Sequence, residues 1–163
     1  MYVFGSQAIL GQYPDAPDAL RQSAEADIAP VNAVDMIDVI DANLGELSLF
    51  HQAFGYYVHG VPIDAAVLPM GWEKRAIAVS NANTNGATAW CVEAHDLAIS
   101  KLVAYRDKDR DFVRTLLAED LVKPRKLLVR IDQLPMNERA SPELRDRIRA
   151  WIRGTLRDLG RAS

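Results

Sequence analysis

The chain has 163 residues, of which 49% are hydrophobic, and a formal net charge of −3. This length and composition predict one soluble domain that buries a sizeable core. No run of 18 apolar residues occurs, which argues against a transmembrane helix. The start lacks the basic region and long apolar stretch of a signal peptide, and the single cysteine, Cys91, rules out an intramolecular disulfide. Together these features predict a cytoplasmic protein.

The charge is distributed unevenly along the chain. Residues 121–163 carry 11 Lys and Arg against 5 Asp and Glu, whereas residues 1–120 carry 8 against 17. We therefore expect an acidic core domain over residues 1–120 and a basic helical extension over residues 121–163 that packs on it. The sequence opens abruptly in a stretch typical of a strand, so we also expect that residues of the parent gene product precede it.

The first 31 residues predict two strands around a turn-rich stretch. Residues 1–4 are apolar, aromatic and β-branched, which favours a strand. A helix is predicted over Gln7–Gly11, with Ser6 as its N-cap. Prolines make residues 11–20 turn-rich, and the alternation in "EADIAPV", residues 25–31, predicts a second strand.

The rest of the chain predicts helices around a β-meander. Between Val34 and Val58 apolar residues recur at helical spacing, with an interruption near Gly45, which indicates two helices. An antiparallel meander is then predicted, with "SNANTNG" turning between its last two strands. Its strands cover residues 64–69, 75–80 and 87–93. Helices are predicted over Asp96–Leu117 and Pro142–Leu159, the latter with Ser141 as N-cap and Pro142 in its first turn. This order predicts an α/β or α+β fold, in which helices pack on a mixed sheet.

Two short patterns near the N-terminus suggest a site for a metal ion and a nucleotide. Glu25 and Asp27 alternate on a strand, so their carboxylates project from one face about 6.5–7 Å apart and can share divalent ions. Gly5 and Ser6 form a turn whose backbone N–H groups and hydroxyl suit an anion such as a triphosphate. In one sheet, these features would make a metal-nucleotide site. The alternative is an ordinary turn and cap beside a solvated acidic face.

The pairing of a hydrophobic-Gly-Ser turn with a later acidic-x-Asp resembles the signature of the polymerase β-type nucleotidyltransferase superfamily. The segments "FGSQAIL", "SAEADI", "GELSLFHQAFGYY", "LPMGW" and "EAHDLAISKLVAYRDKDRDFV" resemble a bacterial nucleotidyltransferase-like family that is distantly similar to AbiEii-type toxins. This resemblance covers about residues 2–117. It implies that Gly5 and Ser6 contact the nucleotide phosphates and that Glu25 and Asp27 are the metal ligands. Two departures stand out: the 18 residues between Ser6 and Glu25 are more than usual, and the first acid is Glu where Asp is usual.

The resemblance also implies a third carboxylate and a phosphate-binding lysine. Asp64, on the first predicted meander strand, is the best candidate for the carboxylate, and Glu93 is the second. Lys101 would then hold phosphate charge as a catalytic and nucleotide-binding residue, with Asp109 as a supporting acid. The alternative for this charged segment is a solvated helix face crossed by ion pairs such as Asp107 with Arg110.

The remaining reactive side chains do not suggest a second site. His51, His59 and His95 lack the spacing of metal ligands, so a zinc site is not expected. A nucleophilic pair of Cys91 and His95 would lack an orienting third group nearby. Cys91 is therefore expected to be buried on a strand, and His95 to help cap a helix.

Arginines recur every fourth residue on the last predicted helix, at positions 145, 149, 153 and 157. Such an arginine stripe can hold RNA phosphates, or it can form ion pairs with the acidic body or with a partner protein. We favour an intramolecular or partner role over nucleic acid.

These observations together predict a nucleotidyltransferase that uses Mg²⁺ or Mn²⁺ to transfer a nucleotidyl group from an NTP to RNA, a protein side chain or a small molecule. Two alternatives stay open: a catalytically inactive partner-binding protein, and an RNA-binding protein that uses the arginine stripe. The resemblance adds a possible place in a toxin–antitoxin pair, with an antitoxin as partner. No membrane partner is expected.

Overall fold

The computed structural model describes residues 1–31 and 33–161 and forms two compact units. Unit 1 comprises residues 1–66 and 73–93, and unit 2 comprises residues 67–72 and 94–163. Residues 162–163, at the end of the basic extension, lie outside the described residues. The division into residues 1–120 and 121–163 stays a prediction. None of the helices in the described part of the chain combines the length and hydropathy that a membrane-spanning helix requires.

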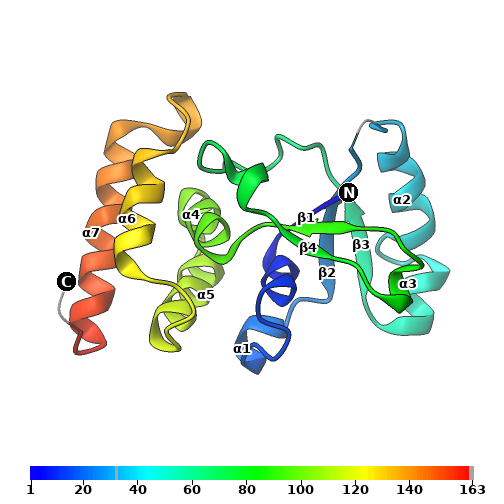
Figure 1. Cartoon of the computed structure of the whole chain (residues 1–163), viewed down its shortest axis with the longest axis horizontal. Helices are drawn as coiled ribbons and strands as arrows, with labels where there is room; N and C mark the ends of the chain where they lie inside the picture. The colour runs from blue at the N-terminus through cyan, green and yellow to red at the C-terminus, as the bar shows by residue number, and fades with distance from the viewer. Residues whose placement is uncertain (32, 162–163) are drawn as a thin grey trace. The chain divides into compact units, whose positions relative to one another are not determined.

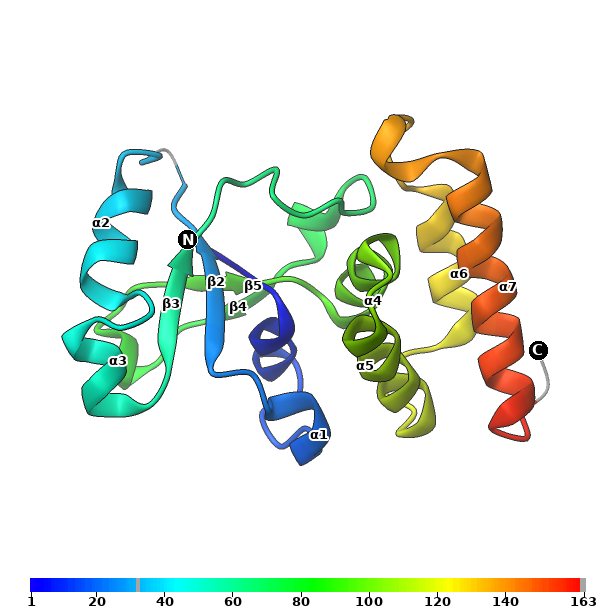
Figure 2. The same cartoon turned by 180° about the vertical axis from the view of Figure 1, so that it is seen from behind.

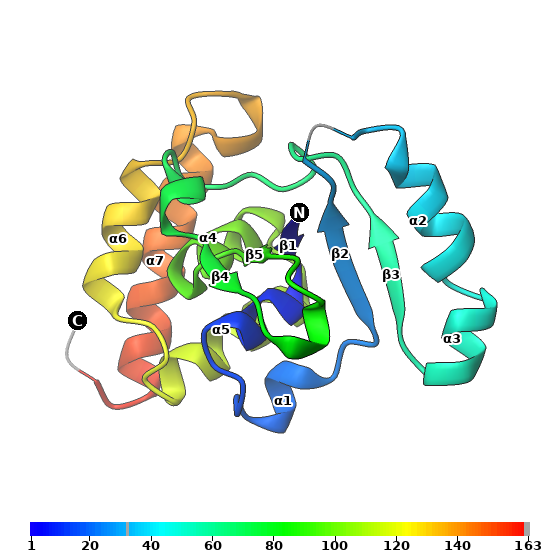
Figure 3. The same ribbon diagram turned by 45° about the vertical axis from the view of Figure 1, so that its right-hand side comes forward.

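Unit 1 is built on a five-stranded mixed sheet, which confirms the predicted α+β class (Figure 1). Its strands follow the spatial order β3-β2-β1-β5-β4. β1 pairs antiparallel with β2 and parallel with β5. β2 and β3 run parallel, as their arrows in Figure 3 show. The strands are β1 (Tyr2–Phe4), β2 (Glu25–Ala29), β3 (Tyr57–Gly60), β4 (Ile77–Val79) and β5 (Ala89–Cys91).

Short helices connect these strands. The 3-10 helix η1 (Ser6–Gly11) follows β1 and buries Ala8 and Ile9 completely. Helix α1 (Asp18–Arg21) precedes β2, and α2 (Met36–Leu44) and α3 (Leu49–Phe54) lie between β2 and β3. The Asp41 carboxylate on α2 accepts a hydrogen bond from the Gly60 amide on β3 at 2.7 Å, which fixes α2 beside the edge strand. The remaining 3-10 helices are η2 (Trp72–Arg75) and η3 (Ala82–Thr84).

Several predictions for unit 1 are confirmed and two are wrong. Both helices between Val34 and Val58 exist, and they are interrupted at Gly45, but the second ends at Phe54. Residues 57–60 instead form strand β3, which pairs with β2. Residues 64–69 form no strand, so the predicted three-stranded meander is reduced to the antiparallel pair β4 and β5. Strand β5 also pairs in parallel with β1, so β5 lies inside the sheet and β4 forms its edge.

Unit 2 is helical in its described part. It contains α4 (Ala94–Ala104), α5 (Asp107–Ala118), α6 (Pro124–Asp132), the 3-10 helix η4 (Glu138–Ala140) and α7 (Pro142–Asp158). Helices α6 and α7 lie side by side (Figures 1 and 2). The core comprises apolar side chains that are completely buried or nearly so, contributed by all four α-helices. They include Ile99, Leu102, Val113, Leu116, Leu127, Ile131, Ile148 and Ile152.

Two predictions for this region need correction. The single helix expected over Asp96–Leu117 is two helices, because Tyr105 adopts a left-handed backbone with φ of 56° and Arg106 is extended. Helix α6 was not predicted, although Pro124 stands in its first turn, a position that proline favours. The last helix is confirmed: Ser141 caps it by accepting a hydrogen bond from the Leu144 amide.

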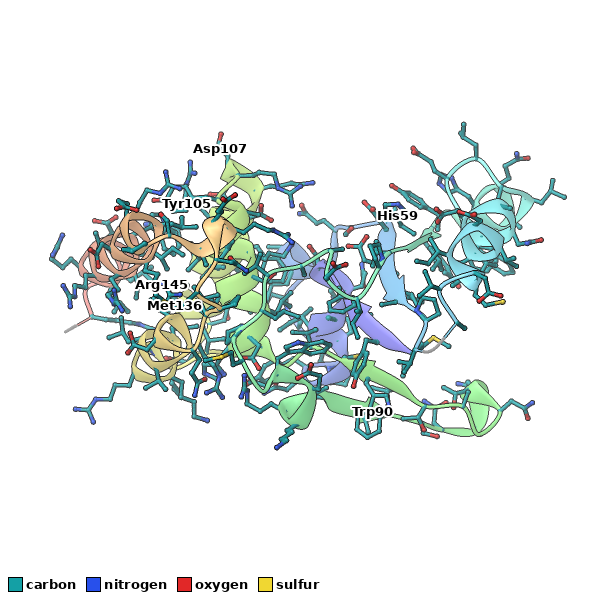
Figure 4. All side chains as sticks on the ribbon, turned by 90° about the horizontal axis from the view of Figure 1, so that it is seen from above. His59, Trp90, Tyr105, Asp107, Met136 and Arg145 are labelled. Atoms are coloured by element: carbon teal, nitrogen blue, oxygen red, sulfur yellow. The ribbon has the colours of Figure 1, made fainter. Side chains whose placement is uncertain are left out.

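Two of the four arginines of the stripe, Arg145 and Arg149, form hydrogen bonds or ion pairs within unit 2. Arg145 is buried and donates to the carbonyls of Ala140, Ile131, Leu134 and Pro135 at 3.0–3.3 Å. In Figure 4 the labelled Arg145 lies beside Met136, whose sulfur is also within hydrogen-bond distance of its guanidinium group.

The next arginine of the stripe, Arg149, pairs with Asp132 and Asp146. The contacts of Arg145 and Arg149 thus lie within the basic segment itself, while Arg153 and Arg157 are exposed. Ion pairing of the stripe with the acidic body or with a partner stays a prediction.

The buried Arg145 leads to a prediction about stability. In an Arg145→Met variant the apolar stem is preserved but four carbonyls lose their hydrogen bonds from the guanidinium group, so we expect the free energy of unfolding to fall by about 3 kcal/mol. The exposed Arg153→Met on the same helix should change it by less than about 0.5 kcal/mol. Urea unfolding followed by circular dichroism measures both. Equal midpoints for the two variants would contradict the structural role of Arg145.

Candidate metal and nucleotide site

The sheet brings the two predicted acidic residues together on one face. Glu25 and Asp27 are alternate residues of β2, so their side chains project in the same direction. Phe4, the last residue of β1, pairs with Asp27, and the chain then turns at Gly5. This antiparallel register places the Gly-Ser turn beside the acidic pair, as the sequence analysis anticipated.

A third side chain, His59, joins the acidic pair from strand β3. The parallel register pairs His59 with Asp27 and Tyr57 with Glu25. His59 Nδ1 lies 3.3 Å from Glu25 Oε1 and 3.5 Å from Asp27 Oδ1. Figure 4 labels His59 beside the strands of unit 1. One ligand atom from each of the three side chains lies within 4.8 Å of the others.

Gly5 lies in close contact with this cluster. Its backbone has φ of 64° and ψ of −168°, a combination that is essentially limited to glycine. A Cβ atom at this position would lie 2.2 Å from Asp27 Oδ2. Gly5 is therefore required both by its backbone conformation and by its close approach to the Asp27 carboxylate.

The neighbouring Ser6 differs from its predicted role as a helix cap. It is the first residue of η1, and Gly5 occupies the N-cap position. The predicted N-cap is wrong because the positive φ that starts η1 suits glycine and not serine. Contact of Ser6 with nucleotide phosphates stays a prediction.

Tyr57 borders the cluster. Its hydroxyl donates a long hydrogen bond, 3.5 Å, to Glu25 Oε2. Removal of the ring hydroxyl from water, together with the negative charge of Glu25, raises the pKa of Tyr57 above its ordinary value. Tyr57 therefore stays a neutral phenol at physiological pH, able to donate to a carboxylate.

The donor set suits a divalent cation. Carboxylate oxygens bind Mg²⁺ and Mn²⁺, and an imidazole nitrogen adds a ligand that transition metals accept. Glu25 and Asp27 are therefore suitable ligands for the Mg²⁺ or Mn²⁺ ion that the sequence pattern predicts.

The predicted third carboxylate does not stand on a strand. Asp64 lies in an exposed turn after β3, because the chain leaves the sheet at Gly60. Glu93 is half-buried, two residues past the end of β5. In the described part of the chain, the cluster that could hold a metal ion contains Glu25, Asp27 and His59. Catalytic roles for Asp64 and Glu93 stay predictions.

Lys101 and Asp109 lie in unit 2 and contact each other. Lys101 Nζ is 3.3 Å from Asp109 Oδ1 and 4.9 Å from the centre of the Phe112 ring, while Arg106 Nε is 2.6 Å from Asp109 Oδ2. Burial raises the pKa of the Asp109 carboxyl, but hydrogen bonds and positive charge from Arg106 and Lys101 outweigh this, so its pKa lies below the usual value. Binding of phosphate by Lys101 stays a prediction.

The sequence analysis missed His59 because its three histidines lack the local spacing of metal ligands. The residue becomes visible only when "YVHG" is recognised as a strand parallel to "EADIA", since the alternation then places histidine opposite Asp27. The expectation for Cys91 is confirmed: it is buried on β5. His95 caps a helix other than its own, accepting a hydrogen bond from the amide of Lys123 at the start of α6.

A comparison with known protein families shows which family the chain belongs to. Residues 1–145 match a family described as nucleotidyltransferase of unknown function (DUF6036). The chain belongs to this nucleotidyltransferase family. The matched region contains the Gly-Ser turn, the acidic pair and Lys101, and it extends into the basic C-terminal segment. No curated protein matches the chain. No solved structure matches it either.

Proposed function

We propose that this member of the nucleotidyltransferase family transfers a nucleotidyl group from an NTP to an acceptor with the help of a divalent metal ion. The observation that carries the proposal is the convergence of Glu25 and Asp27 with His59 in one cluster beside the turn at Gly5. Family membership supports an NTP as the substrate, and the side chains of the cluster can serve as ligands for the metal ion. The acceptor belongs to one of three classes: RNA, a protein side chain or a small molecule.

Each residue has a distinct task in this proposal. Glu25 and Asp27 would hold a divalent ion, which when bound would neutralise phosphate charge and promote attack by the acceptor oxygen. Gly5 would let the turn lie directly against Asp27 and offer its amide to the phosphates, and Ser6 would contribute its hydroxyl and amide to them. Asp64 would complete the acid set, and Lys101 would contribute positive charge.

Isothermal titration of the protein with each NTP tests the proposal, with Mg²⁺, Mn²⁺ or EDTA in the buffer. We expect binding of at least one NTP that requires the metal and disappears in EDTA. Asp27→Asn removes a carboxylate charge with little change of shape, and it should weaken this binding by at least about 10-fold. Asp38→Asn, an exposed residue of α2, serves as the matched control and should leave it unchanged.

Two results would count against the function. Metal-independent binding of every NTP would contradict a metal site at Glu25 and Asp27. Full retention of metal-dependent binding by both Asp27→Asn and Glu25→Gln would show that the nucleotide binds elsewhere. The unfolding midpoint of each variant, compared with that of the wild type, separates loss of binding from loss of fold.

A second candidate function is favoured by apolar side chains exposed on unit 1. Neither α2 nor α3 contains a buried residue, and several of their large apolar side chains are exposed, among them Met36, Val39, Leu49 and Phe54. An exposed apolar surface is typical of a protein interface. An inactive, partner-binding member of the family, including one half of a toxin–antitoxin pair, would account for it. Absence of NTP binding together with formation of a stable protein complex would favour this candidate.

A further inference from the structure

His59 provides a nitrogen donor where the resemblance led us to expect a third carboxylate. It stands opposite Asp27 on the adjacent parallel strand, and its Nδ1 faces both Glu25 and Asp27 at 3.3 and 3.5 Å. Half of the side chain is exposed, so an ion can reach it from solvent. The site is therefore chemically different from a set of carboxylates alone.

The position of Nδ1 calls for a proton or a metal ion between the three side chains. A neutral imidazole that presented the Nδ1 lone pair to two carboxylate oxygens would be repelled by them. Either a proton on Nδ1 or a metal ion bound by all three groups removes this repulsion. The two cases make different predictions about metal binding.

The distances suit a metal ion. Ligands about 2.1–2.2 Å from an octahedral ion are about 3.0 Å apart when they occupy adjacent positions. The 3.3 and 3.5 Å separations from Nδ1 are close to this value, and the three ligand atoms all lie within 4.8 Å of one another. A closure of the cluster would therefore place the three atoms on one face of a coordination sphere. The opposite face would be left for water and for phosphate oxygens.

We propose that His59 is the third protein ligand of this site and that it makes the site selective for a first-row transition-metal ion over Mg²⁺. Mg²⁺ is a hard cation that prefers oxygen ligands, whereas Mn²⁺ and the later divalent ions of the series also bind imidazole. This inference rests on the proposed function, because it concerns the ion held by Glu25 and Asp27. Of the two ions that the sequence suggested, Mg²⁺ and Mn²⁺, the inference favours Mn²⁺, and it adds the later divalent ions of the series as candidates.

Titration with Mn²⁺ alone, without nucleotide or activity measurement, tests the inference. Bound Mn²⁺ is counted by the decrease of the free-ion signal in electron paramagnetic resonance, and Mg²⁺ is added as a competitor. For the wild-type protein we expect Mn²⁺ to bind at least about 10-fold more tightly than Mg²⁺. Pulsed measurements should show coupling of the bound Mn²⁺ to a nitrogen nucleus.

Three variants separate the role of His59 from general effects. His59→Gln should weaken Mn²⁺ binding about 10-fold or more and remove the nitrogen coupling, with a smaller effect on Mg²⁺. His59→Asp replaces nitrogen with a carboxylate and should raise the affinity for Mg²⁺. His51→Gln, on α3 in the same unit, removes a histidine that is not part of the cluster and should leave both properties unchanged.

The outcomes distinguish this inference from the proposed function. If His59→Gln binds Mn²⁺ as tightly as the wild type and no nitrogen coupling is seen, His59 is only an ion-pair partner of the carboxylates. The inference then fails, while a metal-dependent nucleotidyltransferase remains supported by Glu25 and Asp27. If the wild type binds neither Mn²⁺ nor Mg²⁺, even with NTP present, both the inference and the proposed function fail.

Discussion

Replacing Gly5 with alanine should abolish metal-dependent nucleotide binding and lower the free energy of unfolding by about 2–5 kcal/mol. The backbone at Gly5, with φ of 64° and ψ of −168°, is strained for any residue with a side chain. The new Cβ would also lie 2.2 Å from Asp27 Oδ2, which forces the carboxylate or the turn to move. Because Asp27 is a proposed metal ligand, even a protein that accommodates the methyl group should lose its ligand geometry.

Gly55→Ala is the matched control for this prediction. Gly55 also has a positive φ, 74°, but a Cβ atom there would meet nothing within 4 Å. We expect this variant to lose about 1–2 kcal/mol from backbone strain alone and to bind metal and nucleotide normally. Thermal or urea unfolding and isothermal titration measure the two effects separately. Unaltered binding by a folded Gly5→Ala variant would show that metal and nucleotide binding do not require the close approach of Gly5 to Asp27.

The parts of the site that could be predicted from the sequence depend on local patterns. Glu25 and Asp27 face the same way because side chains alternate along any strand, and "EADIA" forms a strand as expected. Gly5 could be recognised because a glycine before a polar residue, directly after an apolar strand, indicates an unusual backbone conformation. The register between β1 and β2 then brings these two local features together.

The parts that could not be predicted depend on pairing between distant segments. His59 reaches the site only because a four-residue strand, within a stretch of helical periodicity, pairs parallel with β2 some 30 residues earlier. The position of Asp64 in an exposed turn follows from the same strand pairing, because β3 ends at Gly60 and the chain then leaves the sheet.

The break between α4 and α5 was missed for another reason. Tyr105 adopts a left-handed conformation, and only glycine or asparagine would have signalled one in the sequence. Its ring lies beneath the guanidinium groups of Arg110 and Arg147, at 4.9 and 4.2 Å from the ring centre. Tertiary contacts within unit 2 thus accompany a backbone conformation that local propensity disfavours.

Asp109→Asn should lower the free energy of unfolding by about 3–5 kcal/mol, the second large effect that we expect. The Asp109 carboxylate is 1% exposed and pairs with both Lys101 and Arg106. Lys101 is itself only 11% exposed, so loss of the negative charge removes an attractive interaction from a nearly buried ammonium group. The exposed Asp111→Asn on the same helix is the control and should change stability by less than about 0.5 kcal/mol.

The pH dependence of stability provides an independent test of the same carboxylate. Since the folded pKa of Asp109 lies below the ordinary value of 3.8, its contribution is fully present above that value and is lost as pH falls through the lower folded pKa. Urea midpoints measured from pH 7 down to pH 2 should therefore fall more steeply below pH 4 for the wild type than for Asp109→Asn. Parallel curves would contradict a stabilising charge at Asp109.

A double variant separates the pair of Lys101 and Asp109 from the function proposed for Lys101. Lys101→Met with Asp109→Asn removes both buried charges, so it should be more stable than Asp109→Asn alone. If Lys101 also holds nucleotide phosphate, the double variant regains stability but binds NTP more weakly than the wild type. If Lys101 is purely structural, stability and NTP binding recover together. If the double variant is no more stable than Asp109→Asn, the cost of that substitution arises from the lost pairing with Arg106 and not from the lost pairing with Lys101.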